Sequence, residues 1–378
     1  MRRLIVCADG TWNKPQANAN GGGLTNVALI STNIPQTASD GTEQVVAYFE
    51  GVGTGDRWNR WTGGAFGSGI SVNIKKVYAF LMRNFRPGDE LYFFGFSRGA
   101  YTVRSVSGMV RKCGILRRLD TGPLSKQELA LVDKAYAFYR QRGPETHPNS
   151  PAAIAFRAEK SHETPIKCLG VWDTVGSLGV PTSGPVGWIS RKRHAFHDVK
   201  LSSRVQNAFH ALAIDERRKP FKPALWEIPH GDPARESGTW RIEQRWFAGV
   251  HSNVGGGYAN RGLSNIALRW MVDRAASCGM EFDAKFVAEV HSGCDCGAEQ
   301  YDSMNLFYKL MGNGERDIEV PRVDPKTGEQ LHTFEEIDST VAERCHSSKI
   351  GTPYRPTNFL RAWSSKPDRF PDFKVPAR

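Results

Sequence analysis

Long apolar runs are missing from this sequence of 378 residues. No stretch approaches the roughly 20 consecutive apolar residues that a membrane-spanning helix needs, which argues against a helical membrane protein. The first residues, "MRRLIVCADG", combine two arginines with a short apolar run, but the run ends at Asp9 after about five residues, too few for a signal-peptide core. We therefore expect a cytoplasmic protein whose first apolar run is a strand, with secretion by a route that needs no signal peptide left open.

Cysteine is scarce and odd in number. Seven cysteines in a chain long enough to bury a large core argue against a disulfide framework and for reduced thiols. The local cluster "HSGCDCG" holds His291, Cys294 and Cys296, which could form a metal site. No matching Cys or His pair lies at the spacing of a zinc finger, so a pair of loop thiols is the preferred interpretation, and no metal or other cofactor is expected.

Recognisable nucleic-acid-binding signatures are also missing, including RNA-recognition motifs, zinc fingers and a basic zipper region. The net charge of +11 favours an anionic partner, whether a lipid headgroup, an anionic substrate or nucleic acid. Local basic clusters lie at 191–193 and 217–219. Charge alone is a weak argument for a nucleic-acid partner. That hypothesis would also require the protein to bind duplexes with a steep salt dependence. We therefore expect no nucleic-acid partner.

The first third of the chain alternates apolar runs with helical periodicity. Strands are expected at 3–8, 44–51 and 90–96, and helices at 25–34, 70–85 and 99–113. This alternation predicts an α/β fold with a mostly parallel sheet flanked by helices. The strands are apolar throughout rather than alternating with polar residues, as in sheets that are buried on both faces.

Beyond Gly114 the pattern loosens. Helices are expected at 124–142, 205–218 and 264–279, strands at 166–179 and 240–258, a mobile segment at 143–165, and shorter helices and loops after 280. No repeat or low-complexity linker divides the chain. We expect one domain, 1–378, with insertions at about 115–165 and 180–240 and a helical C-terminal extension at about 280–378.

The stretch "DELYFFGFSRGAYTVR" places Ser97 between a strand and a helix, in the pattern G-x-S-x-G formed with Gly95 and Gly99. A serine in such a turn is exposed at the carboxyl edge of the sheet, and the glycines shape the site because a Cβ would clash there. The backbone N–H of Arg98, at the start of the helix, could stabilise an oxyanion. A nucleophile is the preferred interpretation, and an ordinary turn serine is the alternative.

A serine nucleophile needs a base and an acid that orients the base. Asp173 ends the strand "CLGVWDTVGS", and His251 follows the strand "RWFAGVHSNVGGGY". Serine, acid and histidine then follow in the chain order found in α/β-hydrolases, each just after a strand. The alternative for Asp173 is a residue that caps a loop through backbone N–H groups.

The competing residues fit less well. Asp215 lies in a helical pattern, where an ion pair with Arg217 or Arg218 is expected, and His210 lies in the same helix. Other histidines lie in polar loops with no strand before them: His147, His162, His194, His197 and His230.

The first strand ends in "CADGTWN", which opens on the same edge of the sheet. Asp9 could shape the site there, and the N–H of Gly10 or Thr11 could be the second oxyanion donor. An Asp-Gly turn with Trp12 as a packing residue is an equal alternative. The glycine-rich segment 51–55 lacks the Lys-Ser/Thr pair of a phosphate-binding loop.

Taken together, these segments resemble a known family. The blocks "CADGTWN", "FEGVGTG", "GDELYFFGFSRGAYTVR", "GVWDTVGSLG", "ALAIDERRKPF" and "FAGVHSNVGGGY" occur in the order found in the uncharacterised α/β-hydrolase family that includes type VI secretion phospholipase effectors. The resemblance runs from about residue 3 to about residue 275. It implies an α/β-hydrolase-like fold and an esterase or phospholipase site at Ser97, Asp173 and His251, with the loop 9–11 in that site.

The expected reaction is transfer of an acyl group to water. His251 would take the proton of Ser97 as the serine attacks an ester carbonyl, Asp173 would hold the imidazole, and water would hydrolyse the acyl-enzyme. The N–H groups of Arg98 and of residues 10–11 would bind the oxyanion. A catalytically idle hydrolase-fold protein that binds an anionic partner is the alternative, although such a protein should have lost one of the three residues.

The expected substrate is an ester or a lipid. Residues 115–165 and 180–200 fall between the candidate strands and are expected to form a lid over the carboxyl edge. The segment 185–196 combines basic side chains with Trp188, Ile189 and Phe196, a composition that suits contact with an anionic membrane surface. A solvated loop with a tucked-in tryptophan is the alternative.

Overall fold

A wholly parallel sheet forms the centre of the molecule. The computed structural model describes residues 1–10, 22–51, 64–175, 201–229, 241–304, 308, 312–325 and 327–365, with 64–68 described by backbone alone. Within these residues, seven strands pair in the order β12-β9-β7-β6-β3-β1-β2. They are β1 (Arg2–Ala8), β2 (Glu43–Phe49), β3 (Glu90–Phe96), β6 (Ile166–Trp172), β7 (Asn207–Ala213), β9 (Arg241–Phe247) and β12 (Glu335–Ile337). Their carboxyl ends share one edge, the usual place for ligands in such sheets.

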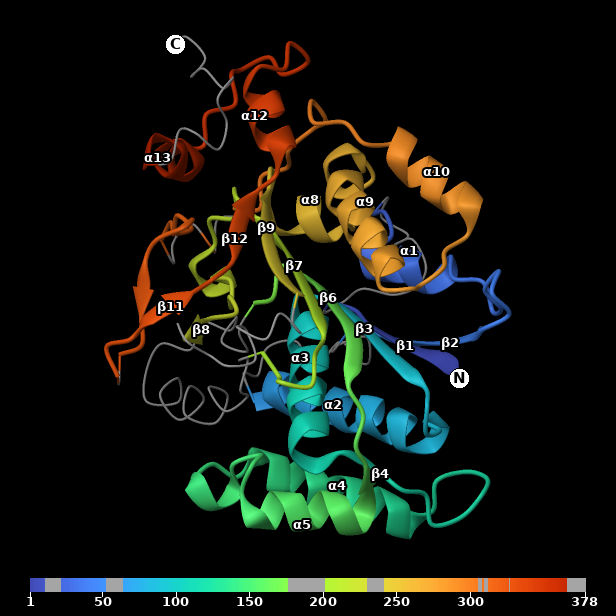
Figure 1. Cartoon of the computed structure of the whole chain (residues 1–378). Helices are drawn as coiled ribbons and strands as arrows, with labels where there is room; N and C mark the ends of the chain where they lie inside the picture. The colour runs from blue at the N-terminus through green and yellow to red at the C-terminus, as the bar shows by residue number, and fades with distance from the viewer. Residues whose placement is uncertain are drawn as a thin grey trace.

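Different helices cover the two faces of the sheet (Figure 1). Leu4, Val6 and Phe93 share a core with α2 (Gly64–Asn84) and α3 (Arg98–Cys113). Ile5 and Cys7 point to the opposite face, into a second core with α1 (Asn26–Thr32) and α9 (Gly262–Ser277). The predicted α/β alternation of the first third is thereby confirmed, and α8 (His251–Gly255) packs beside α9.

The prediction of a helix at 205–218 is wrong. This segment contains β7, which lies between β6 and β9 in the sheet. Six of its seven residues are buried, and they contribute to cores on both faces. A strand buried on both sides has no alternation, so a short apolar run of this kind cannot be told from a buried helix by periodicity.

The prediction of a lid at 115–165 is also wrong. This segment forms β4 (Ile115–Leu116), α4 (Lys126–Arg140), the 3-10 turn η2 (Pro144–Thr146), α5 (Pro151–Lys160) and β5 (Ser161–His162). Tyr136 hydrogen-bonds Ser71 of α2, and Cys113 of α3 contacts a carbonyl of α4. The apolar face of α4 is buried against α2 and the second half of α3, away from the start of α3 (Figure 1). The mobile segment predicted at 143–165 contains α5, which Ser150 caps. The predicted lid segment 180–200 lies outside the described residues.

The prediction of a helical C-terminal extension is only partly right, because this part of the chain also contains strands. It contains α10 (Ala284–Ser292), α12 (Ser339–Cys345) and α13 (Thr357–Ser365), but also strands. β12 pairs with β9 at the edge of the main sheet, while β10 (Arg322–Val323) and β11 (Gln330–His332) form a small antiparallel sheet with β8 (Ile228–Pro229). A third core cluster joins this part to β7 and β9. No helix in the described part of the chain is long and apolar enough to cross a membrane.

Candidate active site

Ser97 occupies a sharp turn between β3 and α3. Its φ of 58° and ψ of −119° place a non-glycine residue in a strained conformation, and its N–H donates to the carbonyl of Trp172 at 3.0 Å. A Cβ on Gly99 would lie 2.0 Å from the carbonyl oxygen of Ala8, and one on Gly95 would lie 2.6 Å from the α3 backbone. The two glycines thus let α3 start directly against β1 and β3, as the G-x-S-x-G pattern predicts.

Asp173 follows β6 immediately and is completely buried. The residues before the two candidates, Phe96 and Trp172, are partners in the β3–β6 ladder, so Ser97 and Asp173 leave adjacent strands at the same level. Asp173 also has a left-handed φ, of 39°. Its N–H donates to the carbonyl of Ala211, and its Oδ1 accepts the N–H of Ala213 at 3.1 Å.

His251 is the first residue of α8, which lies beside β7. Its Nδ1 is 2.5 Å from Oδ2 of Asp173, and its own backbone N–H donates to Glu216 at 3.2 Å. The imidazole packs against the ring of Phe96, at 4.6 Å between centroids, and against the edge of Phe221, at 5.1 Å. Since Phe96 is bonded directly to Ser97, the imidazole lies next to the turn that carries the serine.

The tautomer of His251 follows from its partner. An ionised carboxylate can only accept hydrogen bonds, so Nδ1 carries the proton and Nε2 is left as the acceptor. Burial lowers the pKa of His251 below its usual value, and the bond to Asp173 offsets this only in part. The imidazole is therefore neutral near pH 7, the state that a general base requires.

Arg316 was not found from the sequence. Its Nη1 lies 2.5 Å from Oδ1 of Asp173 and its Nη2 lies 2.9 Å from Oδ2, which makes a bidentate ion pair. Burial alone would raise the pKa of Asp173, but Arg316 and the bond to His251 hold it well below the usual range. Asp173 is thus ionised. It accepts a backbone N–H, as the loop-capping alternative predicts, but it also binds His251 and Arg316.

The Asp9 loop packs tightly against the start of α3, since the Gly99 Cβ position is blocked by Ala8 and Asp9. The Asp9 carboxylate accepts the N–H of Gly10 at 2.6 Å and the hydroxyls of Thr25 and Tyr48 at 2.5 and 2.6 Å. Because the N–H of Gly10 is directed to this carboxylate, Gly10 is the weaker of the two candidate oxyanion donors. The other candidate, Thr11, lies outside the described residues, as does Trp12.

The competing residues have other partners. Asp215 follows β7, and in the described part of the chain it forms no ion pair with Arg217 or Arg218, contrary to the prediction. It accepts the N–H of Gly249 at 2.6 Å and the hydroxyl of Tyr354 at 2.7 Å. Its neighbour Glu216 forms the ion pair with Arg218 instead.

His210 lies in β7 rather than in a helix. Its Nε2 accepts the N–H of Thr174 at 3.1 Å and its Nδ1 is 3.1 Å from Oε1 of Gln244. Burial lowers the pKa of His210 to about 3, so it is neutral. Its hydrogen bonds place it beneath the Asp173 turn as a buried structural histidine.

The cysteine-rich segment shows no ligand geometry. His291 lies 3.2 Å from Asp273, and the Cys294 thiol contacts the carbonyl of Val290. Within the described residues, no three His, Cys, Asp or Glu side chains come together in a way that could hold a metal ion. Cys294 and Cys296 lie in the loop that follows α10.

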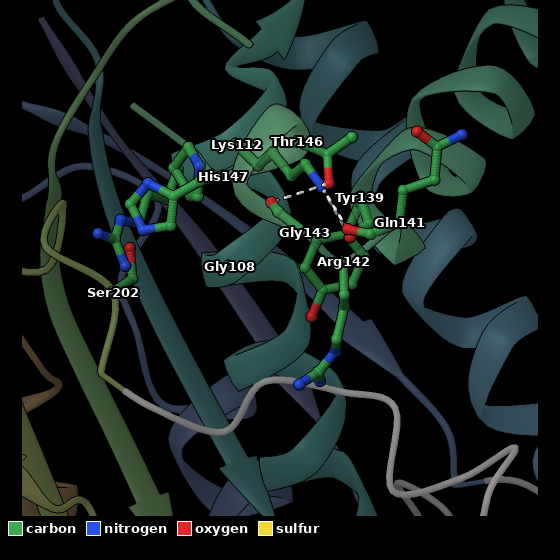
Figure 2. A pocket seen from close by; sticks show the side chains of 11 residues that line it. Gly108, Lys112, Tyr139, Gln141, Arg142, Gly143, Thr146, His147 and Ser202 are labelled. Atoms are coloured by element: carbon green, nitrogen blue, oxygen red, sulfur yellow. Dashed lines mark hydrogen bonds between the residues drawn. The ribbon is translucent and has the colours of Figure 1, made fainter. Parts of the chain in front are cut away.

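A pocket of about 200 Å³ lies elsewhere, between the second half of α3, the end of α4 and η2 (Figure 2). Its lining includes Arg111, Lys112 and Arg142, but none of the three candidate catalytic residues. Lys112 donates to the carbonyls of Gln141 at 2.7 Å and of Tyr139 at 3.5 Å, at the C-terminal end of α4. The lysine there satisfies the carbonyls of a helix end, a structural role.

Comparison with known proteins identifies the family of this chain. The family model for the catalytic domain of Tle1-like phospholipase effectors of the type VI secretion system matches residues 2–274. The chain belongs to this family. The fold predicted from the resemblance, an α/β-hydrolase-like parallel sheet flanked by helices, is therefore confirmed.

Individual relatives of this Tle1-like chain are distant. An uncharacterised protein of Saccharomyces cerevisiae is 26% identical over 242 residues, which cover 58% of this chain and 32% of that protein. The crystal structure of an uncharacterised protein from Pseudomonas aeruginosa matches with 16% identity and a TM-score of 0.47. The matched region covers 77% of this chain and 48% of that protein chain. A Tle1 effector bound to the VgrG spike covers 88% of both chains, with 14% identity and a TM-score of 0.42. The chain thus spans about a third of the curated yeast relative it matches.

Proposed function

We propose that this Tle1-like chain is a serine hydrolase that cleaves carboxylic esters, with phospholipids or other lipid acyl esters as substrates. The observation that carries the proposal is the 2.5 Å bond between Asp173 and His251. These residues lie 78 positions apart in the chain, yet they meet beside a serine held in a left-handed turn at the end of β3. Membership in a phospholipase effector family supports the lipid substrate.

In the proposed reaction, Nε2 of His251 takes the proton of Ser97 as the serine oxygen attacks the ester carbonyl. The imidazolium that forms is stabilised by Asp173, whose ionised carboxylate already accepts a hydrogen bond from the Nδ1–H group. His251 then returns a proton to the leaving alcohol. Water, deprotonated by the same histidine, hydrolyses the acyl-enzyme and frees the acid.

The tetrahedral oxyanion needs two donors. The N–H of Arg98 is the first candidate, because it follows the nucleophile at the positive end of α3, where helix N–H groups point out of the helix. The second donor is assigned to the loop 9–11, whose first residue, Asp9, packs against α3 at Gly99. Within that loop we favour Thr11, because the N–H of Gly10 is bonded to Asp9.

The substrate class is tested by a panel of esters. Purified protein is incubated with p-nitrophenyl esters of graded chain length and with vesicles of anionic or neutral phospholipids, and free fatty acid is measured. We expect release of fatty acid from phospholipid, faster from anionic vesicles because the net charge is +11. Activity on short esters alone would limit the function to an esterase, and no activity on any ester would contradict the proposal.

The variant Ser97→Ala is the negative control in this panel. Ser105→Ala is the matched control, because Ser105 is a buried serine in the same helix, two turns away from the candidate nucleophile. Ester hydrolysis that survives in Ser97→Ala at the wild-type rate would show that another residue is the nucleophile.

A further inference from the structure

The candidate acid of the triad is held by a residue from the C-terminal part of the chain. Arg316 lies outside the matched residues 2–274, and 143 positions separate it from Asp173. Both carboxylate oxygens of Asp173 accept from this one guanidinium, at 2.5 and 2.9 Å. A bidentate pair fixes the plane of the carboxylate as well as its position.

The guanidinium is itself fixed by other contacts. Nη1 also donates to the carbonyl of Ala213 at 2.8 Å, and Nη2 donates to the carbonyl of Phe221 at 2.7 Å. These carbonyls lie at the end of β7 and in the 3-10 turn η3 (Lys219–Phe221), whose Phe221 ring packs on His251. The side chain of Arg316 is 2% exposed and that of Asp173 is fully buried, so water does not screen the pair.

The charges around His251 are balanced in pairs. Asp173 and Glu216 bring negative charge to its ring and its backbone N–H, while Arg316 and Arg218 pair with those two carboxylates. Below the Asp173 turn, His210 is neutral. Without Arg316, the His251 imidazole would face one uncompensated buried carboxylate, which favours the protonated imidazolium.

We propose that Arg316 is a positioning residue of the active site: it fixes Asp173 against Nδ1 of His251 and offsets the charge of that carboxylate. Residues after the family-matched segment then belong to the active site itself. Loss of the positive charge of Arg316 should make His251 more basic. Loss of its two hydrogen bonds to Asp173 should let the carboxylate rotate. For its kinetic readout alone, this inference rests on the proposed Ser97 mechanism.

Two substitutions separate charge from geometry. Arg316→Gln removes the charge but keeps an amide donor, whereas Arg316→Lys keeps the charge but loses the bidentate fork. Matched controls are Arg344→Gln and Arg344→Lys. Arg344 is 3% exposed, also lies in the C-terminal part, and donates to the carbonyls of Cys296 and Ala298 at 2.5 and 2.8 Å, with no bond to Asp173.

Two quantities are measured in the full chain at several pH values. One is kcat/KM on a p-nitrophenyl ester, whose acid limb reports the ionisation of the free base. The other is the NMR titration of the His251 imidazole, assigned by comparison with His251→Gln. The titration needs no turnover, so it remains informative even if the proposed function fails.

In Arg316→Gln we expect the acid limb of kcat/KM and the His251 titration to move up by about one pH unit. We also expect kcat to fall by about tenfold or more. In Arg316→Lys we expect the titration to stay within about 0.3 units while kcat falls about tenfold. The Arg344 variants should lose thermal stability and leave the His251 titration unchanged.

The inference is overturned if a folded Arg316→Gln protein titrates His251 at the wild-type pH, or if Arg344→Gln shifts it equally. If Arg316→Gln does not fold, Arg316→Lys decides the question, because wild-type kcat in that variant would show that the fork positions nothing. A wild-type protein that fails to hydrolyse any ester, yet shows the shifted titration, would contradict the proposed function and leave the positioning role intact.

Discussion

Strained backbone at the residue scale coincides with the proposed chemistry. Among the described residues, four non-glycine residues have a positive φ, and two of them are Ser97 and Asp173. Such conformations cost about 1–3 kcal/mol each and persist where the surrounding structure enforces them. Here the enforcing contacts are the close β1–α3 approach around Gly99 and the Arg316 clamp on Asp173.

The glycines around Ser97 can be tested by stability. Gly99→Ala would place a Cβ 2.0 Å from the Ala8 carbonyl, so backbone must move, and we expect a loss of at least about 2 kcal/mol in the free energy of unfolding. Gly351→Ala is the control, because nothing lies within 4 Å of its Cβ position. Urea unfolding of both variants measures the difference; equal stability of the two would contradict the close packing.

The acid can be tested separately from the nucleophile. Asp173→Asn replaces an acceptor by an amide that can hold the wrong tautomer of His251 and that loses the ion pair with Arg316, so we expect kcat to fall about 10⁴-fold. Asp215→Asn, which changes the competing carboxylate that contacts Gly249 and Tyr354, should keep kcat within about tenfold. A larger fall of kcat in Asp215→Asn than in Asp173→Asn would exchange their roles.

Sequence patterns located Ser97, Asp173 and His251, because each lies directly after an apolar strand run and such residues meet at one sheet edge. Their catalytic roles stay predictions until the variants are assayed. Arg316 could not be located in this way. It follows no strand run and carries no motif, and its contact with Asp173 depends on how the C-terminal part folds back onto β7.

At the scale of elements, β7 is the clearest lesson. Its sequence "NAFHALA" contains helix-forming residues and no alternation, which suggested a helix. Pairing with β6 and β9 on both sides overrides that preference, and the polar His210 is accommodated by hydrogen bonds to Thr174 and Gln244. Neither neighbour is close in sequence, so the local pattern could not show the strand.

The buried histidines predict a pH dependence of stability. Burial lowers the pKa of His210 to about 3 and that of His251 below its usual value, so the unfolded state binds more protons as pH falls below about 6.5. The contribution of these two histidines to the free energy of unfolding is therefore fully present above that pH and decreases towards pH 3. His210→Gln should reduce the slope by about 1.4 kcal/mol per pH unit in this window.

Urea unfolding at pH values between 4 and 7 measures that slope. His291→Gln, which changes an exposed histidine, is the control. A His210→Gln protein with an unchanged slope would show that His210 takes up its proton in the folded state over the same pH range as in the unfolded state, which would contradict its bond from the N–H of Thr174.

At the scale of the whole molecule, the family-matched segment and the C-terminal part form one structure. β12 extends the main sheet at β9, the Trp246 indole donates to Glu335 at 2.8 Å, and a shared core includes Leu212, Val341 and Phe359. The single domain over 1–378 stays a prediction, and these contacts favour it. Sequence analysis missed them because short strands such as β12 carry little periodic signal.

Removal of the C-terminal part should therefore unfold the rest. A chain ending at residue 274 would expose the apolar residues of the third core cluster and the β9 edge, and it would leave Asp173 without Arg316. We expect this chain to lack cooperative thermal unfolding by circular dichroism. A sharp transition together with wild-type activity would show that residues 2–274 form an independent catalytic unit.

Covalent labelling of the nucleophile tests the proposed chemistry most directly. The full chain is treated with a fluorophosphonate, and the adduct is located by mass spectrometry of its peptides. We predict one adduct, on Ser97, formed rapidly by wild-type protein and by Ser105→Ala, and none in Ser97→Ala. Wild-type protein that remains unlabelled, or Ser97→Ala labelled to the same extent, would contradict the assignment of Ser97 as the nucleophile.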